Sequence, residues 1–201
     1  MSVELRETVR TDALVLNFRP AIEMTDAQFA AFCALNRDVR IEQAATGEVI
    51  IMSPTGGETG SSNARLNARL TWWAEADGTG ETFDSSTGFV LPNGAKRSPD
   101  AAWVRKSRYD ALTPEEKRRF PPLCPDFVVE LRSASDDLGP IQDKLAEYIA
   151  NGAQLGWLID PIEHRVHLYR PNAEPEILDA PDRISGDPIL PGFTLDRARL
   201  W

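Results

Sequence analysis

The stretch PDFVVELRSASDD, residues 125–137, decides how the fold is built, because it combines the apolar core of a strand with several charges. Side chains of a strand alternate between its two faces. One face of the predicted strand therefore carries Asp126, Val128, Glu130 and Arg132. A charge inside a packed sheet costs several kcal/mol unless a partner compensates it. The charged face must therefore meet water at the edge of a sheet or belong to a site.

The segment that follows, GPIQDKLAEYIANG (139–152), predicts a helix with a proline near its start and Asn-Gly at its end. Its apolar stripe consists of Ile141, Leu145, Tyr148 and Ile149. Lys144 lies on this stripe, where a lysine is costly unless it reaches water or meets an acid. Glu130, near the end of the preceding strand, is a candidate partner, and Arg132 is a further member of the same charge network.

Upstream, RSPDAAWVRK (97–106) predicts a short strand opened by a proline, with Asp100 at its start. Two acids on neighbouring strands can meet at one end of a sheet. Carboxylate oxygens are the ligands that hard cations prefer, and Mg²⁺ takes one or two of them and keeps several waters. A metal held in this way can polarise a phosphoryl oxygen and deliver a hydroxide. Asp100 and Glu130 are therefore candidate metal ligands.

The remaining elements alternate between helix and strand. Capping boxes at Thr25/Gln28 and Thr113/Glu116 predict two helix starts. A glycine-rich segment from residue 55 becomes helical and ends at Gly78. The order from residue 58 is helix, strands, short helix, strand, helix, strands, which indicates a mixed sheet with helices packed on it.

Composition describes an ordinary globular protein. The chain has 201 residues, 42% hydrophobic and 26% charged, which predicts a single domain with a sizeable core. It has no apolar run long enough to span a bilayer, and its N-terminus has no secretory apolar region. We therefore expect no membrane association and a cytoplasmic location. Cys33 and Cys124 lie far apart and are expected to be reduced.

The net charge of −9 is unfavourable for a nucleic-acid binder, but the charge is uneven. Residues 96–119 hold eight Lys or Arg and four acids, so this segment is +4 and the rest is −13. The segment could face a polyanion. A solvated loop and helix surface explains the same pattern.

Five stretches resemble, in order, the putative restriction endonuclease family, a group of small bacterial proteins of the PD-(D/E)XK nuclease superfamily. They are GEVIIMSPTGGETG, RSPDAAWV, PDFVVELRSASDD, KLAEYIANGAQLGWLIDP and LPGFTLD. They cover residues 47–195. The resemblance implies an α/β fold of restriction-endonuclease-like type, with a mixed sheet flanked by helices and an N-terminal helix and strand addition. The predicted domain covers residues 1–201, with a core of about 47–195.

The resemblance also implies residue roles. Asp100 and Glu130 match the two acids of the superfamily, which hold Mg²⁺ or Mn²⁺. The superfamily's lysine belongs two residues after the second acid, where this chain has Arg132. In this family a lysine from the following helix takes its place, and Lys144 matches it. Glu58 matches an acid on the first core helix.

The activity so implied is metal-dependent hydrolysis of phosphodiester bonds in DNA, by an enzyme that could act as a homodimer. Two other functions stay open. The protein could be a nuclease fold that has lost its chemistry and only binds nucleic acid. It could also be a structural or oligomerisation protein in which Glu130, Arg132 and Lys144 form only an ion network.

Single residues have structural explanations as well. Asp100 could close a turn, and Glu58 could simply favour the helix dipole. Asp126 is interpreted as a residue that begins the strand rather than as a ligand. The tryptophans at 72, 73, 103 and 157 are expected in the core rather than as platforms for stacking bases.

Overall fold

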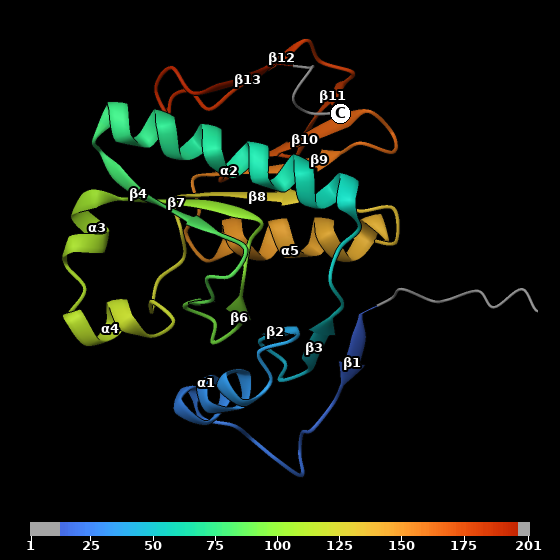
Figure 1. Ribbon diagram of the computed structural model, residues 1–201, viewed down its shortest axis with the longest axis vertical. Coiled ribbons are helices and arrows are strands. Elements are labelled where there is room, and N and C mark those ends of the chain that lie inside the picture. Colours follow the sequence, from blue (N-terminus) through green and yellow to red (C-terminus); the bar gives the residue numbers. More distant parts are fainter. Residues whose placement is uncertain (1–12, 197–201) are drawn as a thin grey trace, which may run out of the picture.

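A six-stranded mixed sheet forms the centre of the computed structural model, which describes residues 13–196 (Figure 1). Its strand order is β11-β10-β9-β8-β7-β4. Only the β8–β9 pair is parallel among these strands, and the other four pairs are antiparallel. The strands are β4 (Gly80–Asp84), β7 (Ala101–Arg105), β8 (Phe127–Leu131), β9 (Leu155–Asp160), β10 (Arg165–Tyr169) and β11 (Glu176–Asp179).

Two long helices cover the two faces of this sheet. Helix α2 (Gly57–Asp77) lies on one face and α5 (Leu138–Ala150) on the other (Figure 1). Strand β8 is buried along its whole length, and its alternate side chains pack in opposite directions. Phe127 and Val129 join the cluster that contains Leu66 of α2, whereas Val128 joins the cluster that contains Leu145 of α5. The strand predicted from residues 125–137 is thus central rather than at an edge.

The helix ends follow the sequence signals. The capping boxes of Thr25/Gln28 and Thr113/Glu116 are both formed. Gly78 ends α2 with a positive φ of 70°, which glycine adopts without steric cost. Helix α5 begins at Leu138, one residue before the predicted start, and connects the parallel strands β8 and β9.

A second sheet lies on the α5 side of the central sheet, with strand order β1-β3-β2-β6-β5 (Figure 1). Helix α1 packs on it through Phe29, which is buried with Ile41 and Val49. The elements of this sheet and of the helix on it are β1 (Leu14–Leu16), α1 (Asp26–Leu35), β2 (Arg40–Gln43), β3 (Val49–Met52), β5 (Phe89–Val90) and β6 (Lys96–Arg97). Helix α1 with β1 and β2 is the predicted N-terminal addition, whereas β3, β5 and β6 lie within the predicted core of about 47–195.

The remaining elements are short. They are α3 (Lys106–Asp110), α4 (Pro114–Arg118) and the two-stranded sheet of β12 (Arg183–Ser185) and β13 (Thr194–Asp196). Across the part of the chain that the structure describes, no helix is both long enough and apolar enough to traverse a membrane. Residues 1–12 and 197–201 of the predicted domain lie outside the described residues.

One expectation about the tryptophans is wrong. Trp103 and Trp157 are buried in the core, and Trp73 packs against it half-buried. Trp72, in contrast, is 68% exposed on the outer side of α2. The apolar stripe of α2 continues through Ala74 instead, because the helix turns Trp72 away from the sheet.

Candidate active site

Asp100 and Glu130 lie on neighbouring strands at the same end of the central sheet. The register pairs Ala101 of β7 with Val129 of β8, and the Asp100 amide donates a hydrogen bond to the Val129 carbonyl at 3.0 Å. The regular pairing ends there, and this hydrogen bond holds Asp100 beside the segment Val129–Glu130. Both carboxylates lie on the α5 side of the sheet, because Asp100 accepts from Arg40 of β2 and Glu130 pairs with Lys144 of α5.

The Asp100 carboxylate is held from two directions. Its Oδ2 accepts a hydrogen bond from the Leu131 amide at 2.8 Å. Its Oδ1 accepts from Arg40 Nη1 at 2.9 Å. On the other side of the sheet, Asn67 of α2 donates its side-chain amide to the Asp100 carbonyl at 2.9 Å. The backbone and side chain of Asp100 are thus fixed by three separate elements.

Lys144 pairs with Glu130, the candidate partner that the sequence offered. Its Nζ lies 2.8 Å from Glu130 Oε1, and the Tyr148 hydroxyl donates to the same oxygen at 3.3 Å. Glu130 is 6% exposed, so this ion pair is removed from bulk water. Lys144 reaches it because its place on the apolar stripe of α5 turns the side chain inward, as the helical spacing predicts.

Strand β2 supplies a second acid to Lys144. Glu42 Oε1 lies 2.8 Å from Lys144 Nζ and also accepts from the Ser98 amide at 3.0 Å. Its other oxygen, Oε2, lies 3.3 Å from Arg97 Nη1. Arg40, two residues before Glu42, reaches across to Asp100 and also donates to the Ser98 carbonyl.

Arg40 and Glu42 are site residues that the sequence reasoning missed. The signal was nevertheless present, because Arg40, Ile41 and Glu42 alternate on a short strand. The two charges therefore share one face, while Ile41 enters the core under α1. This is the same pattern of charge on one strand face that singled out Glu130.

The ion pairs join into one cluster, which extends through Arg97 to Glu147 of α5 at 2.6 Å. Its acids are Glu42, Asp100, Glu130 and Glu147, and its bases are Arg40, Arg97 and Lys144. With every group ionised, the cluster has one negative charge in excess. Within residues 13–196, no group of three or more His, Cys, Asp or Glu is arranged to hold a metal ion, so a cation here would rest on two carboxylates.

The two glutamates that share Lys144 differ in their acidity. Burial raises the pKa of Glu130 to about 7, with Lys144 acting against the rise and the charge of Asp100 adding to it. Burial alone would also raise the pKa of Glu42, but Lys144, Arg40 and Arg97 outweigh it and lower this pKa to about 2. Glu42 is therefore ionised at neutral pH, whereas Glu130 is the acid of the two that takes up a proton more readily.

Two predicted accessory residues lie apart from this cluster. Arg132 Nη1 pairs with Asp160 Oδ2 at 2.8 Å, and its Nε donates to the Asp136 carbonyl. Glu58 is exposed in the first turn of α2 and makes no ion pair with any described residue. Asp126, interpreted as the start of the strand, accepts from the Arg105 amide at the far end of β8.

The basic segment 96–119 presents little free positive charge. Six of its eight cations pair with acids: Lys96, Arg97, Lys106, Arg108, Lys117 and Arg119. Arg105 and Arg118 are exposed and have no ion pair among the described residues. The net charge of +4 is thus largely neutralised by neighbouring acids within the protein.

A mixed sheet covered by α2 and α5, with an N-terminal helix and strands added, defines the class of α/β proteins with a restriction-endonuclease-like fold. Within that class, the chain belongs to the Uma2 family, described as "Putative restriction endonuclease", which matches residues 26–198. This confirms the resemblance that the sequence motifs indicated.

A solved structure shares the fold. It is the crystal structure of a putative nuclease belonging to DUF820 from Anabaena variabilis, with 20% sequence identity and a TM-score of 0.70. The similarity covers 89% of this chain and 97% of that chain. No curated protein matches the sequence.

Proposed function

We propose that the protein is a nuclease that uses Mg²⁺ or Mn²⁺ to hydrolyse phosphodiester bonds in DNA. The observation that carries the proposal is the arrangement of three residues at one end of the sheet. Asp100 and Glu130 both lie on the α5 side of the sheet, where Asp100 contacts Arg40 and Lys144 lies 2.8 Å from Glu130. Membership of the family supports a nuclease, and the metal and the DNA substrate are our proposal.

The residues present fit a hard divalent cation. Asp100 and Glu130 supply the one or two carboxylates that Mg²⁺ takes from a protein, and water and phosphate oxygens would complete its ligands. The cluster has one negative charge in excess, and burial, together with the charges of Asp100 and Glu42, raises the pKa of Glu130. Arg40 is the group that a cation would have to displace from Asp100 Oδ1, or share that oxygen with.

When bound, the cation would polarise a phosphoryl oxygen and activate a water molecule. Lys144 would donate a hydrogen bond to the attacking water or to a phosphate oxygen, and its charge would offset the charge that develops there. The water oxygen forms a bond to phosphorus, one P–O ester bond breaks, and the leaving oxygen takes a proton. Glu42 would keep the ammonium in position throughout.

A cleavage assay with a matched control tests this function. Plasmid DNA would be incubated with the purified protein and Mg²⁺, Mn²⁺ or EDTA. Asp100→Asn and Glu130→Gln should each remove cleavage, and calorimetry should show that both weaken metal binding. Asp143→Asn is the control, because Asp143 is exposed on α5 beside Lys144 in sequence and outside the cluster.

The outcomes separate the three functions that the sequence left open. Metal binding with no cleavage of DNA or RNA would support a nuclease fold that only binds. If no metal binds and the substitutions change only the stability, the cluster is an ion network with a structural role. Cleavage that survives both substitutions would come from a contaminating nuclease and contradict the proposal.

A further inference from the structure

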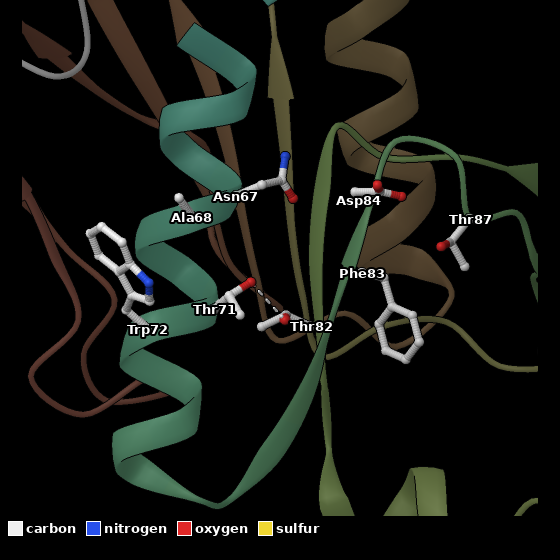
Figure 2. Close-up of a pocket in the computed structure, with 8 residues that line it drawn as sticks. All are labelled: Asn67, Ala68, Thr71, Trp72, Thr82, Phe83, Asp84 and Thr87. Carbon is white, nitrogen blue, oxygen red and sulfur yellow. Dashed lines mark hydrogen bonds between the residues drawn. The ribbon is translucent and has the colours of Figure 1, made fainter. Parts of the chain in front are cut away.

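Trp72 is the only exposed side chain among the tryptophans, tyrosines and phenylalanines of the described part of the chain, residues 13–196. It projects from α2 between two shallow hollows. The larger hollow, about 430 Å³, extends over α2 toward β4 and includes Asn67, Thr71 and Thr82. Figure 2 shows that Trp72 lies on the flank of α2 away from β4, whereas Asn67 and Thr71 point toward β4. The smaller hollow, about 170 Å³, lies between Trp72 and residues 192–194.

Two arginines without ion pairs lie on the same helix face as Trp72. Arg65 and Arg69 precede it by seven and three residues, a spacing that places all three side chains along one stripe. Arg65 bonds only to Ser61 one turn earlier, and Arg69 pairs with none of the described acids. Two exposed acids lie on this face: Glu75 follows Trp72, and Glu58 lies seven residues before Arg65. The two arginines lie between these acids, directly N-terminal to the tryptophan.

That side leads toward the candidate active site. Asn67 lines the larger hollow, and its side-chain amide bonds the Asp100 carbonyl at 2.9 Å. Asp84, at the end of β4, also lines the hollow and pairs in register with Ala101, the residue after Asp100. Oδ1 of Asp84 accepts hydrogen bonds from Ser86. The hollow thus reaches the backbone next to Asp100 from the α2 side of the sheet, whereas the Asp100 carboxylate contacts Arg40 on the α5 side.

We propose that this surface binds a single-stranded segment of nucleic acid, with one base stacked on Trp72 and phosphates bound by Arg65 and Arg69. A stacked base requires an unpaired strand, because the bases of a duplex already stack on one another. The hydroxyls of Thr71 and Thr82, which bond each other at 3.1 Å, offer neutral polar contacts along the path. The choice of nucleic acid as the ligand rests on the proposed function. Binding of this ligand can nevertheless be measured without cleavage.

The first experiment measures the binding of a labelled thymidine oligonucleotide by fluorescence anisotropy. The protein carries Asp100→Asn so that cleavage does not interfere. Trp72→Leu should weaken binding by about tenfold or more, the usual loss of a stacked base, whereas Trp72→Phe should keep most of the affinity. Leu35→Gln is the control, because Leu35 is an exposed apolar residue on α1. Equal affinity of the Trp72→Leu variant and the parent protein, or no binding, overturns the proposal.

The second experiment compares two pairs of unpaired arginines. For a single strand, each phosphate contact contributes roughly 0.7 to the slope of log affinity against log salt. The double variant Arg65→Gln/Arg69→Gln should therefore lose roughly 1.4 of that slope. Arg105→Gln/Arg118→Gln, in the basic segment, should lose little. The opposite result would place the strand on the segment 96–119 and overturn the proposal.

The third experiment separates nucleic acid from a second copy of the chain. Sedimentation of the free protein should give the same mass for the parent and for Trp72→Gln. A dimer that dissociates in the variant would show that the surface joins two copies, which overturns the proposal. Failure of the proposed function would look different, because the protein would then bind oligonucleotide through Trp72 and cleave nothing.

Discussion

Two buried carboxylates share the ammonium of Lys144, at 2.8 Å each. Glu42 keeps other donors, Arg97 and the Ser98 amide, when that ammonium is removed. Among the described residues, Glu130 keeps only the Tyr148 hydroxyl as a neutral donor. Removing Lys144 therefore destabilises the ionised form of Glu130 more than that of Glu42.

Lys144→Met keeps the packing of the side chain and removes its charge. We expect the single-turnover cleavage rate to fall by roughly two to three powers of ten, as for the loss of one positioned electrostatic donor. At pH 8 the free energy of unfolding should fall by about 3–5 kcal/mol, because a buried carboxylate loses its cation. At pH 5.5, where Glu130 is protonated, the loss should be smaller. An unchanged cleavage rate would exclude Lys144 from the mechanism.

The raised pKa of Glu130 predicts how stability depends on pH without metal. The carboxyl titrates near pH 7 in the folded protein and near 4.5 when unfolded. Between these values the folded state binds more protons, so the contribution of Glu130 to stability falls as pH rises and is constant above 7.

Urea denaturation in EDTA tests whether the contribution of Glu130 to stability falls as the pH rises. From pH 4.5 to 7, the free energy of unfolding of the parent protein should fall relative to that of Glu130→Gln. This fall in the free energy of unfolding, relative to the variant, is at most about 1.4 kcal/mol for each pH unit. Parallel curves for the two proteins would show that Glu130 titrates normally in the folded state.

At the scale of elements, local periodicity predicted β8 and α5 but not the contribution of β2. The period of two identified the charged face that carries Glu130, and the helical stripe identified Lys144. No local pattern shows which face of β2 meets the central sheet, because that contact depends on the packing of distant segments. Trp72 was misplaced for a similar reason, since its neighbour Trp73 occupies the inward position.

Arg40 gives β2 a testable role. Its guanidinium lies on Asp100 Oδ1, where it competes with a divalent cation. Arg40→Met should therefore bind Mn²⁺ more tightly, as measured by titration calorimetry. Arg37→Met is the control, because Arg37 contacts only a helix carbonyl nearby. Weaker metal binding in Arg40→Met alone would mean that Arg40 organises Asp100 for the metal instead of competing with it.

The packing of α5 on the sheet depends on Gly156 of β9. A Cβ atom at this position would lie 2.7 Å from Leu145 Cδ1. Gly156→Val should lower the free energy of unfolding by about 1–3 kcal/mol through overpacking. It should also slow cleavage, because Lys144 adjoins Leu145 on the displaced helix. Gly139→Ala, where an added Cβ meets no atom within 4 Å, should change neither quantity appreciably.

At the scale of the whole molecule, the sequence predicted the mixed sheet, its flanking helices and the N-terminal addition. The long elements with a clear period were predicted from the sequence, as were both capping boxes. The strands of two or three residues, such as β5 and β6, were not, because so short a segment shows no period. The single domain and the homodimer stay predictions.

Internal pairing of the cations predicts a shallow salt dependence for nucleic-acid binding. The arginines at 37, 65, 69, 105 and 118 form no ion pair among the described residues. Together they would give a slope of roughly −3.5 or shallower for a single strand. Anisotropy between 50 and 200 mM salt measures it. A much steeper slope would mean that cations such as Lys106 leave their acids when nucleic acid binds.

The Glu42–Lys144 contact joins two segments that are synthesised at different times. The two residues are 102 positions apart in the chain. At about 5–20 residues per second, the ribosome adds the second roughly 5–20 s after the first. Until then Glu42 lacks its lysine, and α5 does not yet exist. Truncated products of stalled translation that end before residue 144 therefore lack the assembled cluster. The cluster is present only in chains that extend beyond this residue.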